Sequence, residues 1–402
     1  MFTDAYWPRV NGVTVSVDSF SLALVKAGHE VTIVCSQYPV DSMTDTIGQT
    51  RNGQEDPIRK QLKLLRVPSR PVFFSGEDRA AKLSCRRWME KELDAFAPDI
   101  VHVNSEFIIG TFGFRYAKKR RLPAVYTFHT IWEDYIANYF PHVPDFLLRS
   151  FVRWYIRRLL KRSTLIIVPT VQIEEMVKSY KIKKETRILP TGIDPDLFRH
   201  DAQAVEGFRR QMEEKYPVVR GKRLLLFAGR VAKEKNLGFV IEMFPELLAK
   251  HPDLVLLIAG NGPGLDGYRE EAKNCGVADS CVFPGYLSRE ELSLVYAISH
   301  IFVLPSVTET QGLVTIEAML SGTPVVAIGA MGTLQVMGGD HGGFMVQNDR
   351  DEFKKRVLQL LEDDDLYRNK VEEARLHAQQ WTIGSLTERL VEIYNATIFI
   401  CR

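Results

Sequence analysis

The chain has 402 residues, of which 45% are hydrophobic and 25% are charged, an ordinary composition for a globular protein. Because a single hydrophobic core rarely grows beyond about 250–300 residues, we expect two domains. Five cysteines form no CxxC pair and no cluster with histidine, so neither a zinc site nor a disulfide framework is expected, and a reducing cytoplasm fits.

Charge and hydropathy patterning indicate where the protein works. The net charge is only +2, yet residues 1–198 carry 29 Lys and Arg against 22 Asp and Glu. This basic half suggests an anionic membrane surface or an acidic substrate, although a solvated surface explains it equally well. No apolar run reaches the length of about 18 residues that a membrane-spanning helix needs. No signal peptide is visible at the N-terminus. We expect a cytoplasmic protein with no nucleic-acid partner.

The chain opens on what looks like the tail of a strand, Phe2–Asp4, whose earlier residues are absent, so we suspect that it begins a few residues late. A loop over Pro8–Gly12 and a helix over Val13–Lys26 follow. Apolar runs rich in β-branched residues then alternate with helical patterns, which predicts repeated βα units and parallel sheets buried on both faces. The expected strands are Val31–Cys35, Leu62–Val67, Asp99–Val103, Ala124–Phe128, Leu165–Pro169, Arg187–Leu189, Arg223–Ala228, Leu254–Ala259, Cys281–Phe283, Ile301–Leu304 and Pro324–Ile328.

Two candidate functional features follow strands of the first half. Gly12 opens the first helix, where a residue without a Cβ lets backbone approach a phosphate or a sugar. His129 follows the strand that ends at Phe128, at the edge where ligands of parallel sheets bind, so a functional and a structural role are about equally supported.

The segment Pro144–Ser163 predicts a basic amphipathic helix. Leu148, Val152, Tyr155 and Leu159 form one apolar stripe, flanked by Phe151 and Ile156, at helical spacing. The stripe alone fits a helix packed on the first sheet. The opposite basic face and the tryptophan between the two faces favour additional contact with an anionic bilayer. The expected membrane-contact residues are Arg149, Arg153, Trp154, Arg157 and Lys161.

The Gly- and Pro-rich segment Pro190–His200 marks the boundary between the two halves. Within it, Asp194-Pro195-Asp196 looks like a metal-binding Asp-x-Asp, but turn chemistry explains it better. Gly260–Gly264 invites a dinucleotide-binding interpretation, which we reject because Leu265 stands where the third glycine should be.

Charged residues follow two strands of the second half. Gly229, Arg230 and Lys235 lie after the strand ending at Ala228, where two cations can hold a diphosphate leaving group. Their alternative role is a solvated basic loop.

Glu309 precedes a helix starting near Gly312 and Leu313, whose free N–H groups offer an anion site. Glu317 lies in apolar surroundings within that helix, where a carboxylate is costly unless it binds a partner such as ribose hydroxyls. Its alternative role is a carboxylate reaching water at the helix edge.

Together these residues resemble family 4 of the retaining glycosyltransferases, which share the GT-B fold. The likeness runs in order through nearly the whole chain, and its most specific part is Glu309 with Glu317-Ala318-Met319 and Gly322-Thr323-Pro324-Val325-Val326. Further matches are Asn11-Gly12-Val13, His129-Thr130, Pro190-Thr191-Gly192-Ile193-Asp194, Gly229-Arg230 with Lys235, and Gly260-Asn261-Gly262-Pro263. Thr310-Gln311 departs from the family pattern, which leaves phosphate contact to backbone N–H groups.

The resemblance implies two Rossmann-like domains facing across a cleft, an acceptor-binding domain over 1–193 and a nucleotide-sugar-binding domain over 194–380, with a helix in 381–402 crossing back to the first. It implies that Arg230 and Lys235 bind the donor diphosphate and that Glu309 contacts the donor sugar. It further implies that Glu317 binds ribose, that His129 lies by the transferred sugar, and that the base lies near Tyr286. The expected donor-binding residues are Gly12, Gly229, Tyr286, Gly312, Leu313 and Glu317.

Within the family, the opening segment and Phe128–Tyr135 look most like diacylglycerol glucosyltransferases and sulfoquinovosyl-diacylglycerol synthases. The expected activity is retaining, metal-independent and cofactor-free transfer of a hexose, with glucose from UDP-glucose expected, to a lipid on the inner membrane face. A family member acting on a soluble or glycan acceptor, including a mannosyltransferase, remains an alternative. A non-catalytic module that binds sugar nucleotides or polyanions is the alternative from another class.

Overall fold

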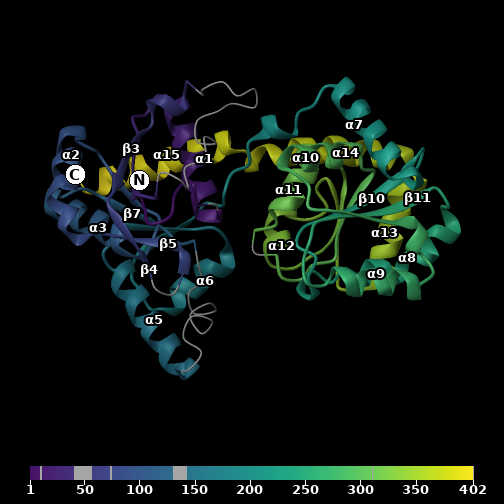
Figure 1. The fold of residues 1–402 in the computed structure, drawn as a ribbon, viewed down its shortest axis with the longest axis horizontal. Coiled ribbons are helices and arrows are strands. Elements are labelled where there is room, and N and C mark those ends of the chain that lie inside the picture. Colours follow the sequence, from purple (N-terminus) through teal and green to yellow (C-terminus); the bar gives the residue numbers. More distant parts are fainter. Residues whose placement is uncertain (10, 40–56, 73–74, 130–142, 310, 402) are drawn as a thin grey trace. The chain divides into compact units, whose positions relative to one another are not determined.

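The computed structural model describes residues 1–401 except 10, 40–56, 73–74, 130–142 and 310. It divides into two compact units (Figure 1). Unit 1 comprises Met1–Gly192 together with Ile383–Arg402, and unit 2 comprises Ile193–Thr382. The changes of unit fall one and two residues from the domain boundaries expected from the sequence.

Unit 1 is built on a seven-stranded sheet of order β3-β2-β1-β6-β7-β8-β9, in which every neighbouring pair is parallel. The expected α/β class with parallel sheets is confirmed. An antiparallel hairpin of β4 (Ser69–Val72) and β5 (Ser75–Ala81) accompanies the sheet. The seven strands are β1 (Phe2–Thr3), β2 (Thr32–Ser36), β3 (Lys63–Val67), β6 (Val101–Val103), β7 (Ala124–Thr127), β8 (Leu165–Val168) and β9 (Glu185–Ile188).

Helices cover both faces of this sheet because its strands are apolar on both sides. One core joins strand residues to α2, α3, α5 and α6, and a second joins them to α1 and α15. The helices of unit 1 are α1 (Gly12–Lys26), α2 (Arg86–Phe96), α3 (Ile108–Arg120), α5 (Asp145–Leu160), α6 (Val171–Ser179) and α15 (Ile383–Cys401).

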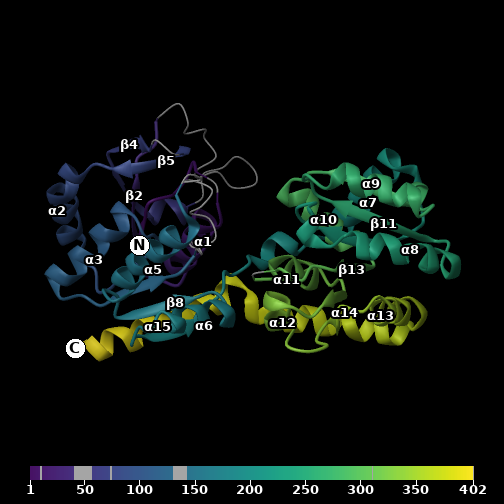
Figure 2. The ribbon, with the colours of Figure 1, turned by 90° about the horizontal axis from the view of Figure 1, so that it is seen from below.

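The last helix, α15, lies beside α1 in Figure 1 and beside β8 in Figure 2, and it packs on the same face of the sheet as α1. Its Leu386 and Leu390 are fully buried with residues of α1 and β8. Its Tyr394 hydroxyl lies 2.6 Å from Nδ1 of His102 on β6. The C-terminal segment is therefore part of the core of unit 1, although unit 2 lies between them in the sequence.

Unit 2 contains a six-stranded sheet of order β12-β11-β10-β13-β14-β15, again with parallel neighbours throughout. Helices α7, α10, α11, α12 and α14 contribute to the core on one face, and α8, α9 and α13 to the core on the other. Its strands are β10 (Arg223–Ala228), β11 (Leu254–Ala259), β12 (Cys281–Gly285), β13 (Ile301–Leu304), β14 (Val325–Ile328) and β15 (Gly343–Val346). Its helices are α7 (Ala202–Lys215), α8 (Gly238–Lys250), α9 (Leu265–Asn274), α10 (Arg289–Ile298), α11 (Leu313–Leu320), α12 (Met331–Met337), α13 (Arg350–Glu362) and α14 (Asp364–Ala378).

Both sheets reverse their strand order once, between β1 and β6 in unit 1 and between β10 and β13 in unit 2. At such a switch point the loops leaving the two central strands diverge to opposite faces of the sheet. Open α/β sheets bind ligands in the resulting crevice, at the carboxyl ends of the strands. The loops after these four strands are therefore where a site is expected in each unit.

Candidate functional site

The switch point of unit 2 brings together two charged residues that are distant in the sequence. Lys235 follows β10 and Glu309 follows β13, and the Lys235 ammonium lies 2.5 Å from Oε1 of Glu309. Their side chains are 20% and 15% exposed, so the pair is mostly shielded but open to a ligand. An ammonium and a carboxylate held side by side can bind an anionic group and a hydroxyl of one ligand.

Backbone contacts fix the two loops that carry this pair. The Asn236 side-chain amide donates to the carbonyl oxygen of Pro305 at 3.1 Å, and the Thr308 hydroxyl donates to that of Glu234 at 3.2 Å. The Glu309 carbonyl accepts from the N–H of Gly332 at 2.7 Å. The relative position of the two loops is therefore set by hydrogen bonds that do not involve the charged side chains.

Glycines after β10 and β11 allow these loops to pack backbone against backbone. A Cβ on Gly260 would lie 1.8 Å from the carbonyl oxygen of Gly229, and a Cβ on Gly262 would lie 2.2 Å from that of Val231. Gly260 also has a φ of 144°, which L residues rarely adopt. The Gly260–Gly264 segment is thus a tight turn packed on the Gly229 loop, and close packing accounts for its glycines.

Arg230 does not join the buried pair. Its side chain is 67% exposed, and its nearest ionic neighbour is Glu234 at 3.9 Å. The two cations expected to act together are therefore in different environments, one held by Glu309 and the other in solvent. A long guanidinium side chain at this position can still reach a ligand bound beside Lys235.

The helix after Glu309 begins at Leu313, with Gly312 as its N-cap at a φ of 65°. This left-handed conformation is one that glycine adopts without strain. The N-cap glycine has no side chain to cap this helix end, so among the described residues the N–H groups of the first turn are suited to binding an anion. Thr310 lies outside the described residues.

Glu317 is half-buried on α11 and accepts a hydrogen bond of 3.0 Å from the hydroxyl of the buried Tyr296 on α10. Burial raises the pKa of Glu317, and the hydrogen bond from Tyr296 and the charge of Arg289 partly offset this effect. Ionising a carboxyl group in these surroundings costs free energy. Groups whose pKa is shifted in this way are concentrated at functional sites. The sequence identified Glu317 but gave no indication of Tyr296 as its partner.

Two further expected residues are placed as follows. Tyr286, directly after β12, is 82% exposed, so its ring is open to a flat ligand. Asp194 caps the short 3-10 helix Pro195–Phe198, accepting a hydrogen bond of 3.1 Å from the N–H of Asp196. The Asp-x-Asp segment therefore has a turn role in unit 2.

The switch point of unit 1 is organised by a buried carboxylate that the sequence analysis missed. Asp4, directly after β1, accepts from the Ser105 hydroxyl at 2.6 Å and from the N–H of Ile109 at 3.0 Å. Burial raises the pKa of Asp4, and these hydrogen bonds partly compensate. Its position directly after an apolar strand was the available signal. Asp4 joins the end of β1 to the loop after β6 and to the start of α3.

Gly12 is the first residue of α1, whose N-cap, Asn11, accepts from the N–H of Thr14 at 2.8 Å. A Cβ added at Gly12 would meet nothing within 4 Å. Among the described residues of unit 1, no packing contact therefore explains the glycine.

His129 lies after β7, with Nε2 3.1 Å from the side-chain oxygen of Asn104, which follows β6. Burial lowers the pKa of His129 to about 4, so the ring is neutral near pH 7. A cavity of about 20 Å³ lies beside it, also lined by His102 and Thr127. His129 thus lies on the carboxyl edge of the sheet as expected, and Asn104 is a partner that sequence reasoning did not find.

Helix α5 has two apolar rows rather than one. Leu148, Val152, Ile156 and Leu159 are buried in unit 1. Phe151, which the sequence analysis placed beside this buried stripe, is exposed. It stacks on Tyr155, a residue of the expected stripe, at 6.5 Å between ring centres. The exposed apolar row consists of Phe146, Leu147, Phe151 and Trp154.

Basic side chains accompany the exposed row of α5. Arg149, Arg153 and Lys161 are exposed, whereas Arg157 is half-buried. Arg153 lies over the ring of Tyr180 at 5.8 Å. Among the helices that the structure describes, none is both long enough and apolar enough to cross a bilayer.

Two family models match the chain, "Glycosyltransferase Family 4" over residues 10–197 and "Glycosyl transferases group 1" over residues 208–377. The chain is 32% identical over 333 residues to alpha-monoglucosyldiacylglycerol synthase of Streptococcus pneumoniae, covering 82% of this chain and 70% of that protein. It is 28% identical over 338 residues to the enzyme of the same name from Acholeplasma laidlawii, covering 81% and 79%.

Solved structures share the fold at low sequence identity. Anabaena HepE in complex with UDP matches with a TM-score of 0.70 at 14% identity, covering 96% of this chain and 97% of that one. A glycosyltransferase from Rickettsia africae matches with a TM-score of 0.72 at 17% identity, covering 98% and 97%. The sequence matches, with the two parallel sheets and their switch points, show that this chain is a glycosyltransferase of family 4 with the two-domain GT-B fold.

Proposed function

We propose that this glycosyltransferase transfers glucose from UDP-glucose to diacylglycerol at a membrane surface, with retention of the α configuration and without a metal ion. The observation that carries the proposal is the Lys235–Glu309 pair at the switch point of unit 2, where a nucleotide sugar would meet both charges. The names of the two relatives, alpha-monoglucosyldiacylglycerol synthases, support the sugar and the acceptor. The UDP bound to Anabaena HepE supports the nucleotide.

In this proposal, unit 2 holds the donor and its cations stabilise the leaving group. Negative charge develops on the β-phosphate as the bond to the sugar breaks. The Lys235 ammonium, which lies 2.5 Å from Oε1 of Glu309, stabilises this charge. The exposed Arg230 closes on the diphosphate from solvent, and the first-turn N–H groups of α11 add further donors. These positive groups do the work that a divalent ion does elsewhere, which supports metal independence.

The carboxylates orient the two sugars of the donor. Glu309 accepts hydroxyl hydrogen bonds from the hexose while it remains beside Lys235. Glu317 accepts from the ribose hydroxyls, which supply the donors that a half-buried carboxylate needs. Tyr286, exposed after β12, offers its ring to the base.

We infer that the reaction proceeds on one face of the sugar. The acceptor hydroxyl oxygen bonds to the anomeric carbon as the bond from that carbon to the phosphate oxygen breaks. The hydroxyl proton passes to the departing phosphate, so UDP leaves with it. Glu309 is engaged with Lys235, which disfavours its action as a nucleophile in a double displacement. A neutral His129 in unit 1 can hydrogen-bond the transferred sugar without adding charge.

We further propose that α5 attaches unit 1 to the cytoplasmic face of an anionic membrane. Its exposed row of Phe146, Leu147, Phe151 and Trp154 has the character of residues that enter the headgroup region. The neighbouring arginines and Lys161 provide attraction to anionic lipid. Peripheral attachment brings the enzyme to a diacylglycerol acceptor that does not leave the bilayer.

The test is a transfer assay with purified protein, radiolabelled UDP-glucose, UDP-galactose and GDP-mannose, and diacylglycerol in anionic vesicles. We expect glucolipid from UDP-glucose alone, in the α configuration by NMR, and unchanged rates in excess EDTA. A β product would overturn retention. Activity lost to EDTA and restored by Mn²⁺ or Mg²⁺ would overturn metal independence.

A soluble or glycan acceptor is the second candidate. A GDP-mannose-dependent alpha-mannosyltransferase of Mycolicibacterium smegmatis is 28% identical over 353 residues, covering 86% of this chain and 83% of that protein. The same panel, with soluble sugars replacing the vesicles, distinguishes the two candidates. Binding of sugar nucleotides with neither transfer nor donor hydrolysis would instead indicate a non-catalytic module.

A further inference from the structure

Buried polar side chains form pairs across β6 and β7 of unit 1, on the face of the sheet that packs against α1 and α15. The two strands are parallel neighbours. Residues two apart along a strand point to the same side, so His102 and Asn104 share this face, as do Thr127 and His129. Polar groups in the interior need hydrogen-bond partners, and these four side chains supply partners to one another.

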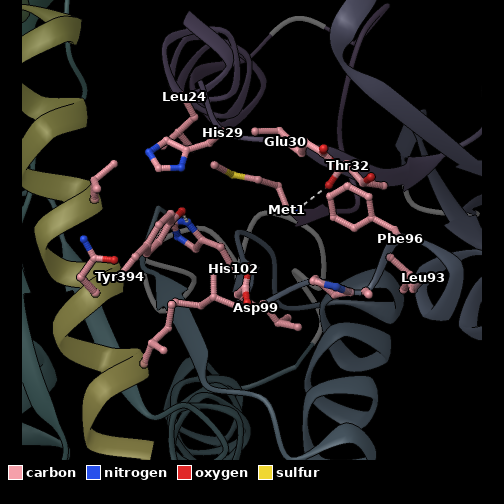
Figure 3. A pocket seen from close by; sticks show the side chains of 18 of the residues that line it. Met1, Leu24, His29, Glu30, Thr32, Leu93, Phe96, Asp99, His102 and Tyr394 are labelled. Carbon is pink, nitrogen blue, oxygen red and sulfur yellow. Dashed lines mark hydrogen bonds between the residues drawn. The ribbon is translucent and has the colours of Figure 1, made fainter. Parts of the chain in front are cut away.

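The first pair is fixed within the interior of unit 1. His102 is buried, and its Nε2 lies 2.6 Å from the hydroxyl oxygen of Thr127. Its Nδ1 lies 2.6 Å from the hydroxyl oxygen of Tyr394, and Figure 3 shows these two side chains next to each other, one from β6 and one from α15. Both ring nitrogens of His102 are therefore engaged, by β7 on one side and by α15 on the other.

The second pair repeats this cross-strand contact two residues further along both strands, at the carboxyl edge of the sheet. Oδ1 of Asn104 lies 3.1 Å from Nε2 of His129. Asn104 is only 4% exposed, and its backbone N–H donates to the carbonyl of Phe2 at 2.8 Å, so it is held in place from β1. His129 is half-buried, which leaves part of its surface open to a ligand.

The contact with Asn104 decides which nitrogen of His129 carries the proton. Burial lowers the pKa of His129 to about 4, so near neutral pH the ring has a single N–H. An amide oxygen only accepts hydrogen bonds, so the nitrogen that faces it, Nε2, must be the donor. Nδ1 then keeps a lone pair, which can accept a hydrogen bond from a hydroxyl group.

We propose that Asn104 is a positioning residue that holds His129 in the tautomer protonated on Nε2, so that Nδ1 accepts a hydrogen bond from a hydroxyl of the transferred sugar. This inference rests on the proposed function, because it requires the sugar to reach the carboxyl edge of the unit 1 sheet. A lone pair at Nδ1 repels an anionic group. The arrangement therefore suits a neutral hexose rather than a sugar that carries an acidic substituent at this position.

The first test reads the tautomer directly in the full chain without substrate, by NMR of the histidine ring nitrogens, with His129→Ala to assign the signals. We expect a protonated Nε2 and a bare Nδ1 in the parent, and a mixture of tautomers in Asn104→Leu. Asn104→Asp keeps an acceptor and should keep the tautomer, while its charge raises the pKa of His129. A protonated Nδ1 in the parent, or an unchanged tautomer in Asn104→Leu, would overturn the proposal.

The second test measures transfer from UDP-glucose and, separately, affinity for UDP, which lacks the hexose. Asn104→Leu should lower kcat/KM about tenfold, the scale of one hydrogen bond, and leave UDP affinity unchanged. Asn104→Asp should restore most of this loss at a pH above the raised pKa of His129. Asn274→Leu, a change at an exposed asparagine of α9, is the control and should leave both quantities unchanged.

A double variant separates positioning from a general effect on the fold of unit 1. In a His129→Ala background, Asn104→Leu should cause no further loss of transfer, because a positioning residue acts only through the residue that it positions. A further loss would overturn the proposal. Because the tautomer is read without substrate, a parent that shows no transfer would count against the proposed function, and the tautomer would still be decided by NMR.

Discussion

Lys235 and Glu309 belong to loops that follow the two strands at the switch point of unit 2, and each determines the environment of the other. Loss of Lys235 removes the charge aimed at the leaving diphosphate and also leaves Glu309 as an unpaired carboxylate. Loss of the exposed Arg230 removes charge without disturbing this pair. The two cations can therefore be separated by experiment.

We predict that Lys235→Ala and Arg230→Ala each lower kcat by roughly 10²–10³, the scale expected when one preorganised transition-state donor is lost. Steady-state transfer from UDP-glucose measures this. Lys233→Ala is the matched control, because Lys233 is an exposed lysine in the same loop and should keep near-normal turnover. Near-normal turnover of either test variant would remove that residue from leaving-group stabilisation.

Glu317 is the residue whose ionisation should control nucleotide binding. Burial raises its pKa, so the carboxylate that accepts from ribose is lost as pH falls through this raised value. We predict that the affinity for UDP weakens as the pH falls from neutrality through this raised pKa. Glu317→Gln should bind UDP more weakly at pH 7 and lose this pH dependence, while its unfolding temperature stays close to that of the parent.

Isothermal titration calorimetry of UDP at several pH values measures this effect. Glu270→Gln, a change at an exposed glutamate on α9, is the control and should keep both the affinity and the pH dependence of the parent. If Glu317→Gln binds UDP as the parent does, Glu317 serves to hold Tyr296 rather than the ribose.

Helix α5 carries the residues for its two proposed roles, packing on the sheet and binding a membrane, in separate rows along its surface. The buried row of Leu148, Val152, Ile156 and Leu159 holds the helix on the sheet, so the outer row can be changed without removing core residues. We predict that changing three arginines of α5 and the lysine that directly follows it to Ser weakens binding to anionic vesicles by up to about a thousandfold at low salt, at about 1 kcal/mol for each cation. The changed bases are Arg149, Arg153, Arg157 and Lys161.

A second variant, Leu147→Ser with Phe151→Ser and Trp154→Ser, should lower binding at high salt as well, because burial of apolar groups is not screened. Co-sedimentation with anionic and neutral vesicles measures both variants. Donor hydrolysis without vesicles should persist in each. Replacing four exposed bases of unit 2, Lys250, Lys273, Lys355 and Arg368, is the control and should leave vesicle binding unchanged. Equal binding of the parent to neutral vesicles would remove the electrostatic part of the proposal.

Strand prediction succeeded where a strand is buried on both faces. The runs at Arg223–Ala228 and Leu254–Ala259 were predicted with the bounds that the structure gives, because fully apolar stretches of this length leave few alternatives. The strand Gly343–Val346 was not predicted, since it is short and begins with a glycine that lies against the backbone of Val325. The β4–β5 hairpin was missed because its strands are polar and contain a proline.

The sequence also predicted the candidate site only in part. Position after a strand was enough to select Lys235, Glu309 and His129 from the sequence, because the carboxyl ends of parallel strands meet at one edge. It did not indicate which side chains pair there. The contact of Tyr296 with Glu317 and that of Asn104 with His129 join different elements, and no local pattern encodes either.

The two units of the molecule do not correspond to two continuous segments of the chain. Unit 2 is one continuous segment, whereas unit 1 needs the last helix after unit 2 is complete. Except for Gly12, all the residues that we expect to bind the nucleotide sugar belong to unit 2. The donor and the last helix should therefore affect the stability of different parts of the protein.

We predict that ending the chain after Thr382 destabilises unit 1 and spares unit 2. The truncation removes the fully buried Leu386 and Leu390, each worth about 1.5–3 kcal/mol of burial, and the Tyr394 partner of His102. Hydrogen exchange should become faster throughout unit 1 of the truncated protein and stay unchanged in unit 2. UDP at about 100 times its Kd should stabilise unit 2 by about 2.7 kcal/mol in both proteins, with slower exchange at residues 229–236 and 309–317. Loss of UDP protection on truncation would mean that the nucleotide also depends on unit 1.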